Sequence, residues 1–374
     1  MSTPPPAEIG MPLEVVDTPA LLLDLDAFER NLTRLAQAVA GRPVRFRPHA
    51  KSHKCPVIAL RQLAHGAIGV CSQKVSEAEA LVHGGVPDVL ISNEVVGASK
   101  LARVAALAKL ARVAVCADHP GNVRDLNEVA LAYGVRLPVL VEVNVGGERC
   151  GLEPGEPAVA LATQIARSPG LRFAGLQAYQ GPAQHIRDHA KRKDAIDQAA
   201  EKIRRTQDGL QRAGLACEVV SGAGTGTFHF EAASGVWNEL QAGSYIFMDA
   251  DYAKNLQADG SSTPEFEHSL FVYATVMSHP IKERAVLDAG LKALAVDSGM
   301  PWVAGMPDAE YVRAADEHGK LLLHDPNRSL EVGQKVKLIP GHCDPTVNLY
   351  DWYVGYRGNR VEALWPITAR GLGR

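Results

Sequence analysis

The hydrophobic and polar positions of this chain follow one pattern up to residue 251 and a different pattern after it. In the first part, short apolar runs alternate with amphipathic stretches, such as residues 74–83 and 156–167, and residues 185–213 form the longest. Continuously apolar runs are typical of parallel strands buried on both faces, and the stretches between them predict helices. The predicted strands are residues 44–47, 67–72, 88–93, 113–118, 138–144, 172–179, 217–222 and 240–248.

Eight strands with intervening helices over about 210 residues match the size of a (β/α)8 barrel. A doubly wound open sheet is the alternative for the same alternation. After residue 251 the helical periodicity fades, and turn formers separate short strand-like pieces that predict a mainly β-domain. These pieces are residues 269–277, 284–289, 292–296, 335–339 and 352–357.

An early apolar segment, residues 19–26, predicts a further strand that either the barrel or the β-domain can accept. We assign it to the β-domain. The expected organisation is therefore a barrel over residues 27–252, followed by a β-domain built from residues 12–26 plus 253–374.

Composition and charge exclude several classes of protein. The chain of 374 residues carries 39 basic and 42 acidic side chains, a net charge of −3, so it lacks the basic surplus of a nucleic-acid or membrane-surface binder. The sequence contains no uninterrupted run of 18 apolar residues, so it predicts no transmembrane helix. Six scattered cysteines without a Cys-x-x-Cys pair are typical of reduced thiols, and the first residues lack an apolar signal core, so we expect a cytoplasmic location.

The run RPHAKSHK at residues 47–54 carries the first candidate chemistry. It follows a predicted strand, and a lysine just past a strand end can form a Schiff base with an aldehyde cofactor. Such a lysine needs a lowered pKa, which burial or cationic neighbours supply. Arg47, His49, His53 and Lys54 are candidate neighbours of Lys51.

Polar residues follow the other predicted strands as well, where barrel enzymes carry their active sites. After the seventh strand, the run SGAGTGT at residues 221–227 offers small residues and hydroxyls that let backbone N–H groups approach a phosphate. Ser244 and Tyr245 end the eighth strand, and barrels often bind phosphate with the loops after strands seven and eight. An ordinary glycine-rich turn is the alternative reading of this run.

Three further side chains are candidates at the barrel mouth. Arg149 can face a cofactor oxygen or a substrate carboxylate, or it can be a surface arginine in a turn. Tyr179 can contact the cofactor ring, or it can be a core tyrosine. His185 can act as a base, or it can be a solvated residue at the start of a helix.

Near the other terminus, the run GHCDPT at residues 341–346 places His342 and Asp344 two positions apart. On a strand this spacing turns both side chains to one side and Cys343 to the other. One imidazole and one carboxylate make half a site for Mn²⁺ or Mg²⁺. A histidine beside an Asp-Pro turn is the alternative.

Several segments together resemble the fold-type III pyridoxal-phosphate enzymes of the D-threonine aldolase and D-serine dehydratase family. The resemblance extends from about residue 15 to residue 374 and implies an alanine-racemase-like barrel followed by a β-domain. The runs that carry it are residues 18–21, 24–26, 47–51, 73–78, 92–95, 149–151, 177–179, 222–226, 240–245 and 341–346.

The resemblance also implies roles for individual residues. It assigns the Schiff base to Lys51 and not to Lys54, and it places the cofactor phosphate on Gly224, Thr225 and Gly226 and on Ser244 or Tyr245. It makes His342 and Asp344 the metal ligands. The dehydratases of the family carry His-x-Cys and bind zinc, whereas the aldolases carry His-x-Asp, so this chain looks like an aldolase.

The expected activity is therefore cleavage of a D-3-hydroxy amino acid of the D-threonine type into glycine and an aldehyde, with pyridoxal 5'-phosphate and Mn²⁺ or Mg²⁺. His185, or a water on the metal, would take the hydroxyl proton. The alternatives are a 3-hydroxy-D-aspartate aldolase that forms glycine and glyoxylate, and a dehydratase that releases ammonia. A non-catalytic pyridoxal-phosphate carrier would resemble the barrel alone. A homodimer is expected from the resemblance.

Overall fold

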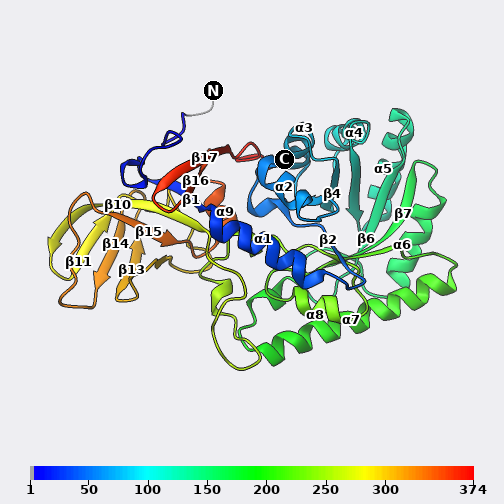
Figure 1. The fold of residues 1–374 in the computed structure, drawn as a ribbon. Coiled ribbons are helices and arrows are strands. Elements are labelled where there is room, and N and C mark those ends of the chain that lie inside the picture. Colours follow the sequence, from blue (N-terminus) through cyan, green and yellow to red (C-terminus); the bar gives the residue numbers. More distant parts are fainter. Residues whose placement is uncertain (1–3) are drawn as a thin grey trace.

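The computed structural model describes residues 4–374, which form a parallel barrel and an antiparallel β-domain side by side (Figure 1). The barrel sheet has eight strands in the order β2-β9-β8-β7-β6-β5-β4-β3, and every pairing is parallel. The predicted (β/α)8 barrel is thus confirmed and the doubly wound sheet is excluded. The strands are β2 (Arg45–Phe46), β3 (Val70–Ser72), β4 (Asp88–Glu94), β5 (Arg112–Ala117), β6 (Leu137–Glu142), β7 (Leu171–Ala178), β8 (Val219–Gly222) and β9 (Glu239–Leu240).

Backbone hydrogen bonds between β2 and β3 close the barrel. The N–H of Ile68 donates to the carbonyl of Phe46 at 3.0 Å, and the N–H of Cys71 donates to the carbonyl of Pro48 at 2.8 Å. Seven α-helices lie along the chain between or beside these strands and cover the outside of the sheet (Figure 1). They are α2 (Pro56–Ala64), α3 (Val75–His83), α4 (Ala98–Leu107), α5 (Pro120–Tyr133), α6 (Glu156–Arg167), α7 (His189–Arg212) and α8 (Phe228–Ala233).

Two predicted elements of the barrel are shorter than expected. The helix predicted over residues 185–213 begins at His189, because the carboxylate of Asp188 accepts the N–H of Lys191 and so acts as its N-cap. The strand predicted over residues 240–248 ends at Leu240, and a 3-10 helix, Ser244–Ile246, follows. Gly243 lies against the loop after β2, where a Cβ would be 2.7 Å from Oγ of Ser52, so the chain turns inward there.

The β-domain is one nine-stranded sheet in the order β11-β14-β13-β12-β15-β10-β1-β16-β17. The early segment joins this sheet and not the barrel, since β1 pairs antiparallel with β10 and parallel with β16. Helix α1 (Leu25–Val39) follows β1 and returns the chain to the barrel. The strands are β1 (Ala20–Asp24), β10 (Leu270–Ile281), β11 (Arg284–Leu287), β12 (Trp302–Val303), β13 (Ala309–Ala314), β14 (Gly319–Leu323), β15 (Lys335–Ile339), β16 (Trp352–Arg357) and β17 (Arg360–Pro366).

Residues 292–296, predicted as a strand, are a turn and coil instead, so that prediction is wrong. The N–H of Lys292 donates to the carbonyl of Asp316, and the N–H of Leu294 donates to that of Gly290. A Cβ at Gly290 would lie 2.2 Å from the carbonyl oxygen of Ala315, so two backbone segments cross closely at this turn. The strands β12, β13, β14 and β17 were not predicted, because they are short or carry several charged residues.

His342 and Asp344 do not lie on a strand, contrary to the prediction. His342 precedes a short helix, α9 (Cys343–Val347), and Asp344 is in its first turn. Pro345 suits this place because the N–H groups of a first helical turn have no partner within the helix. Helix α9 lies where the β-domain meets the barrel (Figure 1), and the N–H of Cys343 donates to Asp249 at the end of the barrel, at 3.1 Å.

All six cysteines are free thiols, as predicted. No helix within residues 4–374 is long and apolar enough to cross a membrane.

Candidate active site

A cavity of about 410 Å³ opens at the carboxyl ends of the barrel strands, where α9 reaches it from the β-domain. Side chains and backbone from most of the barrel strand ends converge there, as the sequence predicts for a barrel enzyme. Nine of the residues singled out from the sequence line it: Lys51, Arg149, Tyr179, His185, Gly224, Thr225, Ser244, His342 and Asp344.

Lys51 enters the cavity from a 3-10 helix, Ala50–Ser52, directly after β2. Its Nζ lies 3.7 Å from Oδ2 of Asp344, and the side chain remains 40% exposed. Burial lowers the pKa of Lys51, but the carboxylate of Asp344 raises it, and the outcome is a pKa above the ordinary value. The expectation of a lowered pKa is therefore not met in the protein alone, because the opposite charge nearest to Lys51 comes from the other end of the chain.

The cationic neighbours expected for Lys51 are engaged elsewhere or neutral. Arg47 forms an ion pair with Asp88 at 2.6 Å, and Lys54 forms one with Glu77. Burial lowers the pKa of His49 to about 3, and it lowers the pKa of His53 to about 3 as well.

His49 instead positions the lysine. Its Nδ1 accepts the backbone N–H of Lys51 at 3.4 Å, so its Nε2 carries the proton and lies 3.0 Å from Oε1 of Gln73.

The loop after β8 has the features of an anion site. Oγ1 of Thr225 is buried and has no hydrogen-bond partner within the described chain. Gln184 holds the loop from behind, since its Oε1 accepts the N–H of Gly226 at 2.9 Å and its Nε2 donates to Thr227 at 2.8 Å. A Cβ at Gly224 would lie 2.4 Å from Oε1 of Gln184, so a larger residue there would displace the amide that holds the loop. The loop therefore offers backbone and a free hydroxyl to the cavity, which fits a phosphate.

Two residues predicted to contact the phosphate do not line the cavity. Gly226 borders a separate small pocket behind the loop. The ring of Tyr245 is fully buried, and its hydroxyl lies 3.3 Å from Nε2 of Gln62. Neighbouring Ser244 and Thr225 do line the cavity.

Arg149 and Tyr179 lie together on the side of the cavity formed by β6 and β7. The guanidinium of Arg149 is 5.7 Å from the centre of the Tyr179 ring. Burial raises the pKa of Tyr179, while Lys51 and Arg149 act in the opposite direction, so the phenol stays protonated at neutral pH. Both side chains can donate hydrogen bonds to an oxygen bound between them.

His185 is held by an acid that the sequence did not single out. Its Nδ1–H donates to Oδ2 of Asp251 at 2.7 Å, and Arg187 forms an ion pair with the same carboxylate. The imidazole is 53% exposed and lines the cavity. Because Nδ1 carries the proton, Nε2 is left as a proton acceptor.

His342 is held in the same way. Its Nδ1–H donates to Oδ2 of Asp297 at 2.7 Å, which leaves Nε2 free as a metal ligand. Burial lowers the pKa of His342, but Asp344 and Asp297 raise it above the ordinary value. Burial raises the pKa of Asp344, but Lys51 and His342 lower it overall. An ionised carboxylate and an oriented imidazole facing one cavity fit a hard divalent metal.

The site also contains residues that the sequence did not reveal. Asp251 and Asp297 become visible only when the fold brings them to the histidines. Asp249 accepts the N–H of Tyr252 at 3.0 Å and the N–H of Cys343, and so connects the end of the barrel to α9. The pair Gln177 and Gln241 forms a hydrogen bond of 2.8 Å on the cavity floor, at strand ends that the barrel pattern could have indicated.

The fold and this arrangement of residues define an alanine-racemase-like barrel with an additional β-domain. A family model described as "Alanine racemase, N-terminal domain" matches residues 23–251, and one described as "Putative serine dehydratase domain" matches residues 269–356. The chain therefore belongs to the family of proteins built on the alanine racemase N-terminal domain.

Among its relatives are two aldolases that match nearly full length. The chain is 48% identical over 375 residues to a D-threonine aldolase of Arthrobacter sp, which covers 100% of this chain and 98% of the relative. It is 46% identical over 372 residues to a 3-hydroxy-D-aspartate aldolase of Paracoccus denitrificans (strain Pd 1222), covering 98% and 96% of the two chains. The crystal structure of D-threonine aldolase from Filomicrobium marinum matches with a TM-score of 0.96 and 53% identity, covering 99% and 100%.

Proposed function

We propose that this protein is a carbon–carbon lyase that cleaves D-3-hydroxy amino acids of the D-threonine type to glycine and an aldehyde, with pyridoxal 5'-phosphate and Mn²⁺ or Mg²⁺. One observation carries the proposal. Nζ of Lys51 lies 3.7 Å from Oδ2 of Asp344, so the amine for a Schiff base and the metal carboxylate share one cavity. The near full-length likeness to two aldolases supports the same reaction class.

The chain's own residues would hold the cofactor as follows. Lys51 would form the Schiff base with its aldehyde group, and the backbone at Gly224, the hydroxyl of Thr225 and Ser244 would hold its phosphate. Arg149 and Tyr179 would donate hydrogen bonds to it from the cavity wall. When bound, the cofactor supplies a pyridine ring that accepts electrons from the bond broken at the substrate Cα.

The metal would be held by His342 and Asp344, with Asp297 fixing the ring orientation of His342. When bound there, the ion supplies a Lewis acid for the substrate hydroxyl. Nε2 of His185 accepts the hydroxyl proton, while Asp251 stabilises the imidazolium that forms.

The likeness to a 3-hydroxy-D-aspartate aldolase supports 3-hydroxy-D-aspartate as a second candidate substrate. The β-carbon of this substrate carries a carboxylate, for which Arg149 is a candidate partner on the cavity wall. In that case the products are glycine and glyoxylate.

The proposal includes the organisation of the molecule. Residues 27–252 form the cofactor-binding barrel, and residues 12–26 plus 253–374 form the β-domain that carries the metal pair. We also propose that the protein is a cytoplasmic homodimer and that it acts on small D-amino acids.

The test is a product assay on D-threonine and D-3-hydroxyaspartate, with Mn²⁺ or with EDTA, recording glycine, aldehyde or glyoxylate, and ammonia. Glycine with a carbonyl product, formed only with metal, supports the proposal and ranks the substrates. Ammonia with a 2-oxo acid would overturn it in favour of a dehydratase.

His342→Ala provides the matched variant for this assay. It should retain the visible absorbance of the bound cofactor and lose cleavage. Undiminished cleavage by this variant after EDTA treatment would disprove the role of His342 and Asp344.

A further inference from the structure

Three acidic side chains stand on the inner face of the barrel, at the ends of β4, β5 and β6. Side chains alternate along a strand, so Asp118 lies on the same face as Cys116, and Glu142 on the same face as Leu140. Cys116 and Leu140 belong to a small apolar cluster inside the barrel. Glu94, which is in register with Cys116, completes the group. These acids therefore lie over the apolar cluster inside the barrel.

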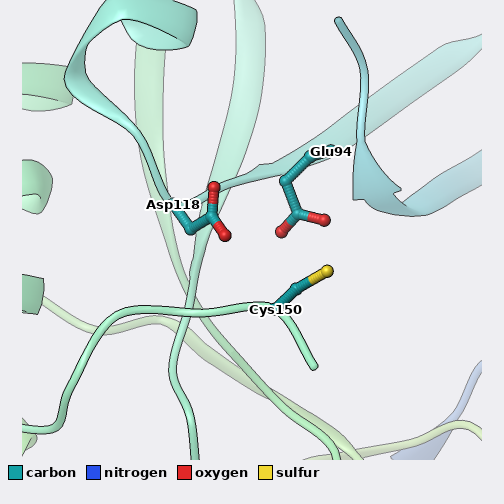
Figure 2. A group of neighbouring side chains, drawn as sticks. All are labelled: Glu94, Asp118 and Cys150. Carbon is teal, nitrogen blue, oxygen red and sulfur yellow. The ribbon is translucent and has the colours of Figure 1, made fainter. Parts of the chain in front are cut away.

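A thiol from the next loop joins them. Carboxylate oxygens of Glu94 and Asp118 and Sγ of Cys150 all lie within 4.8 Å of one another. Figure 2 shows the carboxylate of Asp118 turned toward Glu94, and the carboxylate of Glu94 turned toward Sγ of Cys150. No other group of three or more potential ligands within residues 4–374 comes this close together.

The loop that carries Cys150 is fixed in place. The N–H of Leu152 donates to the carbonyl of Glu142 at 2.9 Å, which folds the loop back over the end of β6. Gly151 has a φ of +101° and donates its N–H to Oδ2 of Asp118 at 3.0 Å. A Cβ on Gly151 would lie 2.7 Å from the backbone nitrogen of Asn144, so glycine is required there. The thiol is consequently presented to the acids by a preformed backbone.

Two of the acids, Glu94 and Glu142, have carboxylate oxygens without a hydrogen-bond partner among the described residues, whereas Asp118 accepts the N–H of Gly151. Glu142 is only 5% exposed, and its Oε2 has no hydrogen-bond partner in the chain from residue 4 onward. Both carboxylate oxygens of Glu94 are also buried without a partner. None of the ion pairs formed by the described residues includes Glu94, Asp118 or Glu142. Buried carboxylates without a counter-charge are costly, so this group needs protons or a cation.

The electrostatics agree with that need. Burial, and then Glu94, raise the pKa of Glu142 to about 9, and burial raises the pKa of Cys150 to about 11. Arg149 opposes both shifts from one side, but it also lines the main cavity.

We propose that Glu94, Asp118 and Cys150, with Glu142 beside them, bind a second divalent cation of the Zn²⁺ class. Zn²⁺ accepts both thiolate sulfur, at about 2.3 Å, and carboxylate oxygen, at about 2.0–2.2 Å, so small side-chain shifts bring this set to bonding distance. Binding forms the metal–sulfur bond and releases the thiol proton to solvent. This site is separate from His342 and Asp344 and goes beyond the proposed function.

The site has a consequence for the main cavity. A small cavity of about 60 Å³ beside it is lined by Glu142 and Cys150 and shares Arg149 and Tyr179 with the main cavity. A cation bound to the acids neutralises their negative charge. The guanidinium of Arg149 can then interact with groups in the main cavity.

Metal binding to the cofactor-loaded protein tests the proposal, with Co²⁺ as the spectroscopic probe for a Zn²⁺ site. The wild type should bind two equivalents of Co²⁺. His342→Ala combined with Asp344→Ala should bind one equivalent and still show thiolate-to-cobalt charge-transfer absorption, which added Zn²⁺ removes. If the wild type and the double variant each bind one equivalent of Co²⁺, the site at Glu94, Asp118 and Cys150 is supported. In that case His342 and Asp344 do not bind a metal, and that part of the proposed function is overturned.

Variants of the cluster, made in the double-variant background, complete the test. Cys150→Ser should abolish the charge-transfer band and weaken Co²⁺ binding at least tenfold, and Glu94→Gln should weaken it similarly. Cys343→Ser, which changes the thiol beside the other pair, should keep the band. If Cys150→Ser does not fold, Asp118→Asn takes its place in the test. The amide oxygen of this variant can still accept the N–H of Gly151. Absence of bound Co²⁺ in the double variant, or binding insensitive to Glu94→Gln, would overturn the proposal.

Discussion

On one side of the barrel mouth, each charged group faces a group of opposite charge or a hydrogen-bond acceptor. Lys51 faces Asp344, His342 donates to Asp297, and His185 donates to Asp251. On the other side, over β4 to β6, both carboxylate oxygens of Glu94 and Oε2 of Glu142 are buried without hydrogen-bond partners among residues 4–374. Both sides lie at the same strand ends, so the fold alone does not set the difference.

The contrast shows two ways of preparing a site. Paired groups fix proton positions before a substrate arrives, because each buried hydrogen bond chooses one tautomer or one charge state. Unpaired carboxylates have no fixed proton position or charge state until they bind a proton or a cation. Catalytic proton transfer suits the first arrangement, and capture of a cation suits the second.

The largest expected effect comes from removing the amine on the paired side. Lys51→Ala should abolish cleavage and the visible absorbance of the covalently bound cofactor, because no other amine in the cavity replaces it. Lys54→Arg is the matched control and should retain both, since Lys54 pairs with Glu77 outside the cavity. Loss of the absorbance in the Lys54 variant alone would reassign the covalent bond.

His185→Asn should lower kcat by about 10²–10⁴-fold with a smaller change in KM, because the side chain would act as a general base. Asp251→Asn should lower kcat less and shift its pH profile, since it acts through His185. His189→Asn serves as the control from α7. Steady-state kinetics with D-threonine measure all three variants, and equal losses in His185→Asn and His189→Asn would argue against a chemical role.

Asp297→Asn should weaken Mn²⁺ affinity by about 10–100-fold, because outer partners orient metal-binding histidines. Ser298→Ala, which removes a weaker contact of 3.4 Å to the same imidazole nitrogen, should change the affinity little. Titration of Mn²⁺ against cleavage rate and against bound metal gives the comparison. Unchanged affinity in Asp297→Asn would mean that His342 is held by its backbone alone.

The smallest effect concerns Glu231, a carboxyl buried in α8 and away from both sides of the mouth. Burial raises its pKa to about 7, and its Oε1 accepts the hydroxyl of Thr227. The folded state therefore keeps this proton where the unfolded chain releases it, so stability should fall as pH rises from about 4.5 to 7, by at most about 3 kcal/mol. Thermal unfolding of Glu231→Gln should show a weaker decline over that range. Identical pH profiles for variant and wild type would contradict the assignment.

The sequence predicted the residues that line the cavity best where those residues belong to one short stretch of the chain. The loop at residues 224–226, Lys51 after its strand and the His342–Asp344 pair are each visible within a few positions of the chain. The pKa of Lys51 was predicted in the wrong direction, because the residue that raises it, Asp344, lies far from Lys51 in the sequence. Asp251 and Asp297 were missed for the same reason, since only the folded chain brings them to the histidines.

The barrel was predictable because its strands are continuously apolar. Residues 293–296 are also apolar, yet they lie in a turn and coil, because Gly290 lies against the backbone at residues 315–318. Their burial comes from crossing segments and not from pairing in a sheet. Strand β13 was missed because charged residues occupy its exposed positions, and β14 was missed because it has only five residues and begins with Gly319 and Lys320.

Strand β1 leaves the ribosome long before its neighbours in the sheet do. Leu22 is buried between Phe271 of β10 and Val354 of β16, which are synthesised about 250 and 330 residues later. At about 5–20 residues per second, this apolar strand waits roughly 10–70 s for its partners. All eight barrel strands, β2 to β9, are synthesised before the first of these partners, whereas β1 remains without its neighbours in the sheet. The order of synthesis therefore makes the β-domain, with His342 and Asp344 beside it, the last part of the chain to form.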